Sequence, residues 1–101
     1  MNLYKQKGEN LKYPERIEIW KRDDKVPEWL SDRARVLNID EKGEKQIAIV
    51  DWKNSFDIIS NSGNEKLVQT KSRDSIICFD PVNDIVFSLT QKQFNLLYKK
   101  V

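Results

Sequence analysis

Short apolar segments separated by turn sequences recur along most of this chain, and this pattern constrains the fold more than any other feature. Three pairs of such segments flank the turn sequences DEKGEK, NSGN and PVND: 34–39 with 46–50, 56–60 with 65–70, and 75–80 with 85–89. Turn residues between two short apolar runs are typical of a β-hairpin. Gly43 in the first turn supplies the positive φ that hairpin turns often need. The sequence therefore predicts three β-hairpins.

A further strand is indicated at residues 16–22, RIEIWKR. Apolar residues alternate with polar ones, so Ile17 and Ile19 share one face, whereas Trp20 falls among charged residues on the other. We expect Trp20 to be exposed on that polar face. PEWL, which begins at Pro27, predicts a short helix, because proline is favoured in the first helical turn. We expect the other two tryptophans to lie in the core: Trp29 and Trp52.

The end of the sequence predicts a helix. Thr90 and Gln93 have the T-x-x-Q spacing of a capping box. Apolar residues then follow at positions i, i+3, i+4 and i+7, which places them on one face of a helix: Phe94, Leu97, Tyr98 and Val101. Such a short helix is marginal alone, so we expect it to pack on the sheet.

Together these elements predict an α+β fold, in which the C-terminal helix packs on a small antiparallel sheet or partly closed barrel of about six to seven short strands. A length of 101 residues indicates a single domain, 1–101. Residues 1–14 are polar and are expected to form an irregular, flexible N-terminal arm. The single cysteine and the lack of a long apolar segment favour a reducing, cytoplasmic location without a membrane partner.

The residue inventory argues against an enzyme. The chain has no histidine, the commonest general base and a frequent zinc ligand. It also lacks a glycine-rich phosphate-binding motif. Cys78 has no histidine to activate it, and the carboxylates cluster in turn sequences, where they cap the backbone. We therefore expect no catalytic residues, no metal site and no cofactor.

Charge is distributed unevenly, although the net charge is only +2. Residues 1–22 carry six basic and three acidic side chains, a net of +3, and residues 91–101 carry three lysines and no acid. If the two ends meet in space, they form a basic patch that suits an acidic partner. The candidate binding residues are Trp20 and six cations: Lys5, Lys7, Lys12, Arg16, Lys21 and Arg22. Lys99 and Lys100 would join them from the other end.

The order of these segments resembles a group of small, mostly uncharacterised phage-encoded proteins. Those proteins close with Gly-Asp-Tyr/Trp-Ile-Ile/Val, a turn, a strand and then Phe-x-x-x-Tyr-x-x-Val. This chain has a similar ending, with Asp74, Ile76 and Ile77 before the hairpin and the same spacing in the helix. It departs from the pattern at Arg73, where glycine is usual, and at Ser75, where an aromatic residue is usual. The resemblance implies a phage origin, and no catalytic residue carries over.

These observations favour a non-enzymatic phage accessory protein that binds and inhibits a host protein, such as a defence nuclease, in the host cytoplasm. One alternative is a nucleic-acid or nucleotide-binding module, because Tyr4, Tyr13 and Trp20 lie among the basic residues of the arm. Another is a virion or structural interaction module. The sequence leaves the oligomeric state open, and a homodimer is one alternative.

Overall fold

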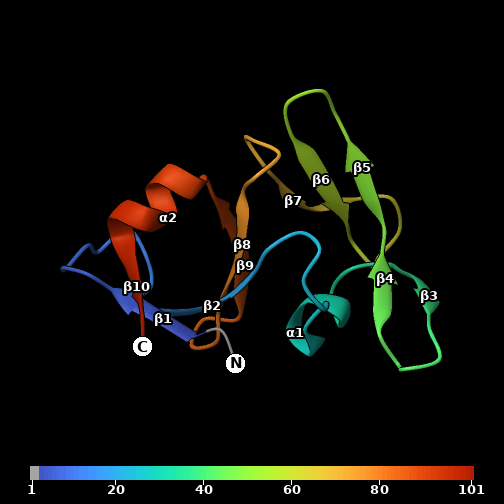
Figure 1. Ribbon diagram of the computed structural model, residues 1–101, viewed down its shortest axis with the longest axis horizontal. Coiled ribbons are helices and arrows are strands. Elements are labelled where there is room, and N and C mark those ends of the chain that lie inside the picture. Colours follow the sequence, from blue (N-terminus) through green and yellow to red (C-terminus); the bar gives the residue numbers. More distant parts are fainter. Residues whose placement is uncertain (1–2) are drawn as a thin grey trace.

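A computed structural model describes residues 3–101 of the chain, and the first two residues of the expected N-terminal arm lie outside this part (Figure 1). Strands dominate and one helix lies near the C-terminus, which confirms the α+β class. The elements are β1 (Leu3–Gln6), β2 (Arg16–Trp20), α1 (Glu28–Ser31), β3 (Val36–Ile39), β4 (Lys45–Ile47), β5 (Ile49–Asp51), β6 (Phe56–Ile59), β7 (Lys66–Gln69), β8 (Ile76–Asp80), β9 (Ile85–Leu89), α2 (Gln91–Leu97) and β10 (Tyr98–Lys100).

The largest sheet has five strands in the order β10-β1-β2-β8-β9, and every neighbouring pair is antiparallel. β1 lies inside this sheet, between the last strand of the chain and β2 (Figure 1). The expectation of an irregular arm is therefore wrong for residues 3–6. These residues are too polar to indicate a strand locally, and their pairing partner β10 lies at the far end of the sequence.

The remaining strands form two smaller antiparallel sheets, β3-β4 and β5-β6-β7. All three predicted hairpins are present, as β3–β4, β6–β7 and β8–β9. The expected strand 46–50 is divided, however, between β4 and β5, which belong to different sheets. The expectation of one sheet or a partly closed barrel is wrong, because the strands form several open sheets. Register shifts interrupt the ladders between Val36 and Asn38 and between Ile58 and Ile59. Such irregularities bend strands and end their pairing.

The helix α2 covers one face of the five-stranded sheet, which confirms that it packs there (Figure 1). The expectation that Tyr98 and Val101 continue its apolar face is wrong, because α2 ends at Leu97 and the chain becomes extended as β10. Its capping box is formed, with the Thr90 side chain accepting from the Gln93 amide and the Gln93 side chain accepting from the Thr90 amide. Phe94 lies edge-on to Tyr4 of β1, with ring centroids 4.9 Å apart, and stacks near Tyr98. This core is completed by five buried residues of the sheet: Ile17, Ile19, Ile76, Cys78 and Leu89.

A second core lies against the opposite face of β2 and β8. There Trp20 and Ile77 pack with Leu30 of α1 and with Phe56 and Ile58 of β6. Trp20 is only 3% exposed, and its indole Nε1 donates to the carbonyl oxygen of Asp24 at 3.0 Å. The expectation that Trp20 is exposed is therefore wrong. Local alternation identified its face correctly, but α1 and the three-stranded sheet cover that face.

The other tryptophans also differ from one another. Trp29 is partly buried and stacks on Phe79, with ring centroids 5.1 Å apart and planes 9° apart. Trp52, expected in the core, is 52% exposed. Its indole Nε1 donates to the buried Asp57 carboxylate at 2.7 Å. Within residues 3–101, neither helix is long and apolar enough to cross a membrane.

Candidate functional site

Three cations lie side by side across the edge of the five-stranded sheet. Lys5 in β1 is directly opposite Lys99 in β10 on one side and directly opposite Arg16 in β2 on the other. Residues directly opposite in antiparallel strands point to the same face, and neighbouring strands are about 4.8 Å apart. We call Arg16, Lys5 and Lys99 the basic row.

The basic row lies on the sheet face that α2 leaves uncovered. Tyr4 packs edge-on against Phe94 of α2, and successive side chains of a strand point to opposite faces. Lys5 therefore points away from the helix. Arg16 and Lys99 are exposed and Lys5 is half-buried. A partner can reach all three side chains from the solvent.

Among residues 3–101, no ion pair neutralises this row. The ion pairs among residues 3–101 join other side chains: Arg22–Asp51, Arg33–Asp84, Lys66–Asp57 and Arg73–Asp51. Glu18 lies on the same face two residues along from Arg16, but it makes no ion pair with the row within the described residues. Like charges directly opposite in a sheet are destabilising. The row therefore costs the free protein stability and favours a bound anionic group.

Only two of the six predicted cations belong to this row. Lys7 lies past the end of β1 and donates to the carbonyl of Asn95, while Lys12 and Lys21 are exposed in loops. Arg22 lies at the opposite end of β2, where it pairs with Asp51 and covers the Phe56 ring at 5.0 Å.

Arg22 has a structural explanation. Its hydrogen bond lowers the pKa of the Asp51 carboxyl and raises the pKa of the Arg22 guanidinium. Trp20 is buried and also has a structural role. Lys99 belongs to the row but is not one of the six candidate cations; the sequence indicates only that it would join them if the two ends met. The signal for it was the excess of basic residues in 91–101.

The aromatic residues near these cations in the sequence point elsewhere in the structure. Tyr4 and Tyr13 pack against the core under α2, and Trp20 packs in the core on the side of α1. They do not stand beside the basic row. The row is consequently an electrostatic surface, and these rings supply no stacking platform for bases there.

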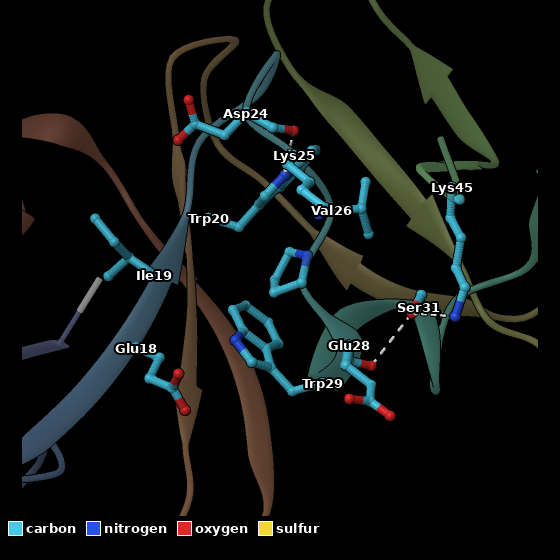
Figure 2. A pocket seen from close by; sticks show the side chains of 12 residues that line it. Glu18, Ile19, Trp20, Asp24, Lys25, Val26, Glu28, Trp29, Ser31 and Lys45 are labelled. Carbon is cyan, nitrogen blue, oxygen red and sulfur yellow. Dashed lines mark hydrogen bonds between the residues drawn. The ribbon is translucent and has the colours of Figure 1, made fainter. Parts of the chain in front are cut away.

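A pocket of about 580 Å³ opens between the segment joining β2 to α1 and the tip of the β3–β4 hairpin (Figure 2). Trp20, Pro27 and Trp29 provide apolar walls, and Glu18 and Glu28 also line the pocket. On the far side, the Lys45 ammonium lies 3.4 Å from the Ser31 hydroxyl, which donates to the Glu28 carbonyl. Charges of both signs line the pocket, so it indicates no single class of ligand.

No group of three metal-ligating side chains is present among residues 3–101. Cys78 is completely buried, and burial raises the pKa of its thiol to about 12. The thiolate that nucleophilic chemistry needs is therefore scarce at neutral pH.

No protein-family model, curated protein or solved structure matches this chain. Function has to be inferred from the residues themselves. The basic row is the most specific arrangement that they offer, because it combines exposure, exact cross-strand register and an uncompensated charge.

Proposed function

We propose that this chain is a non-enzymatic binding protein whose basic row docks on an acidic surface of a partner protein. One observation carries the proposal: Arg16, Lys5 and Lys99 lie in register on three neighbouring strands and form no ion pair within the described part of the chain. A carboxylate-rich surface would neutralise the row and relieve its self-repulsion. Complementary charge at an interface speeds encounter and selects the partner.

An acidic protein surface fits the row better than a nucleic acid does. Three cations at the spacing of strands span only about 10 Å. Typical DNA-binding proteins neutralise roughly six to ten phosphates, and the net charge of this chain is only +2. The nearby tyrosines face the core under α2 and do not present rings for stacking on bases.

The phage-like order of segments supports a host protein as the partner and inhibition as the outcome. A nuclease that uses metal ions clusters carboxylates in its active site. Such a cluster is one acidic surface that the basic row fits. In this setting the protein acts in the host cytoplasm. It occupies the partner's site without carrying out chemistry of its own.

The test is a pull-down from bacterial lysate with matched charge reversals. The first bait is the wild type and the second is Lys5→Glu/Lys99→Glu. The third is the control Lys53→Glu/Lys71→Glu, which makes the same change in net charge at exposed positions outside the row. We expect the wild type and the control to recover the same stoichiometric partner. The row variant should lose it, and the partner should elute as salt rises toward about 0.5 M.

Other outcomes would contradict the proposal. Equal recovery by all three baits would show that the row does not contact the partner. Salt-sensitive binding of wild type to purified DNA or RNA, without a protein partner, would assign the row to nucleic acid. Presence of the protein in purified phage particles would favour a structural role in the virion.

A further inference from the structure

The outer edge of β10 presents backbone groups that the sheet does not use. The Val101 amide donates to the Leu3 carbonyl, and the Lys7 amide donates to the Leu97 carbonyl. Because hydrogen-bonded pairs alternate along an antiparallel ladder, the inward-facing positions are 97, 99 and 101. Tyr98 and Lys100 therefore direct their backbone groups outward.

Most of these outward groups have no backbone partner among residues 3–101 and can accept another strand. The Tyr98 amide is the exception, because it donates to the Phe94 carbonyl at the end of α2. The Lys100 amide, the Lys100 carbonyl and the Tyr98 carbonyl remain on the open edge. The Lys100 amide and carbonyl can make the two hydrogen bonds of one residue pair in an antiparallel ladder, and the Tyr98 carbonyl can accept one more from the neighbouring pair.

We propose that this edge receives an extended acidic segment of the partner as an added strand, an inference that rests on the proposed function. β-strand addition draws affinity from main-chain hydrogen bonds and specificity from alternating side chains. Lys99 points to the face of the basic row, and Lys100, opposite Tyr4, points to the face of α2. Two consecutive acidic residues on an added strand would each lie beside one of these lysines.

The basic row then gains the charge that it lacks. An acidic side chain opposite Lys99 extends the series from Arg16 through Lys5 and Lys99 to a carboxylate. Val101, which is 59% exposed, follows Lys100 and points to the same face as Lys99. It favours an apolar residue next to the acidic pair. The edge therefore selects a segment in which two acidic residues are flanked by apolar ones.

A second copy of this chain does not fit the same edge. Antiparallel pairing of two β10 strands would place Lys100 opposite Lys100 in one register and Lys99 opposite Lys99 in the other. Lysines on edge strands oppose such self-association. The same side chains that exclude a second copy attract an acidic strand. The partner is therefore a different polypeptide.

The probe is a capped hexapeptide, Thr-Val-Glu-Glu-Val-Thr, which reads the same in both directions and so fits either strand orientation. It is titrated into the ¹⁵N-labelled full chain to about 5 mM, a concentration that detects weak binding. We expect saturable shifts at β10 and β1. Amide exchange at Lys100 should slow on the order of tenfold or more, because pairing protects a backbone N–H from solvent.

Two control peptides separate strand addition from simple charge attraction. Thr-Val-Lys-Lys-Val-Thr should not bind, because it repels both lysines. The glutamate peptide with N-methylated glutamates keeps the charge but cannot complete the ladder, and it should bind at least about tenfold more weakly. Equal binding of the methylated peptide, with Lys100 exchange unchanged, would overturn strand addition and leave docking on the basic row intact.

Variants at Lys100 complete the test. Lys100→Pro removes the outward N–H but spares the pairing with β1, and proline is tolerated on edge strands. Lys100→Gln removes the charge and keeps the N–H. We expect Lys100→Pro to lose binding and Lys100→Gln to retain part of it with a protected amide. Undiminished binding by Lys100→Pro would overturn the proposal. The pull-down from lysate tests the basic row independently of this result.

Discussion

Lys5 lies directly opposite Lys99, in the pair of strands that joins the two ends of the chain. Both side chains point to the face that α2 leaves uncovered, and Arg16 continues the row on the other side of Lys5. A sheet stabilised only by its own contacts would place an acidic residue between two basic ones. The arrangement instead places three like charges side by side.

Replacing the central lysine of the row should stabilise the free protein. Lys5→Glu converts two like-charge pairs, with Arg16 and Lys99, into two opposite-charge pairs. Cross-strand pairs contribute roughly 0.2–1 kcal/mol each, so we expect the free energy of unfolding to rise by about 1 kcal/mol in low salt. Urea denaturation measures this change.

Salt and a matched control test the electrostatic cause. The gain from Lys5→Glu should shrink at about 1 M salt, where charges are screened over about 3 Å. Lys53→Glu, which changes an exposed lysine outside the row, should leave stability nearly unchanged. A loss of stability in Lys5→Glu at low salt would show that the three side chains do not repel one another.

Burial should make Trp20 far more important to stability than Trp52. Trp20→Ala removes a core side chain that contacts α1 and β6, and such truncations cost about 3–5 kcal/mol. Trp52→Ala loses one hydrogen bond to Asp57 and a contact with Lys66, whose ammonium lies 5.8 Å from the ring centroid. We expect roughly 1–2 kcal/mol there. Thermal and urea unfolding of both variants measure the difference, and equal losses would contradict the assigned burial.

Local sequence signals predicted the elements of this fold better than their arrangement. The β8–β9 hairpin and the capping box at Thr90 depend on residues close in sequence, and both are present. The pairing of β1 with β10 depends on residues at opposite ends of the chain, and no local pattern reveals it. The excess of basic residues at both ends predicted a patch if the ends met. Only the strand register shows that Lys5 and Lys99 are the residues that meet.

Tryptophan exposure illustrates the same limit. Alternation in RIEIWKR correctly assigned Trp20 to the face opposite Ile17 and Ile19. It could not show that α1 and β6 would cover that face, because the covering elements come later in the chain. Trp52 directly follows β5, which ends at Asp51, and its indole remains at the surface, where it donates to Asp57.

The capping box of α2 should contribute to stability as a coupled pair. Thr90→Ala removes the acceptor for the Gln93 amide and should cost about 1 kcal/mol. Gln93→Ala removes the reciprocal hydrogen bond to the Thr90 amide. If the two residues act together, the double variant should lose less than the sum of the single losses. Urea denaturation of all four proteins measures the coupling, and strict additivity would contradict it.

Alkaline pH should destabilise the fold through Cys78. Burial raises the pKa of its thiol from 9.0 to about 12, and burial likewise raises the pKa of the Tyr98 hydroxyl from 10.0 to about 12. Above pH 9 the unfolded chain releases the thiol proton while the folded chain keeps it. Because the unfolded state then binds fewer protons, the free energy of unfolding falls as pH rises. The Tyr98 hydroxyl adds to this fall above pH 10.

The window from pH 9 to 10 isolates the cysteine, because the Tyr98 hydroxyl, whose ordinary pKa is 10.0, contributes mainly at higher pH. We expect wild type to lose stability across this window and Cys78→Ala to lose less, whatever the cost of the small cavity at neutral pH. Urea denaturation at several pH values compares the two slopes. A thiol reagent should also label Cys78 only as fast as the protein unfolds. Parallel slopes, or rapid labelling of the folded protein, would show that the thiol is accessible to solvent.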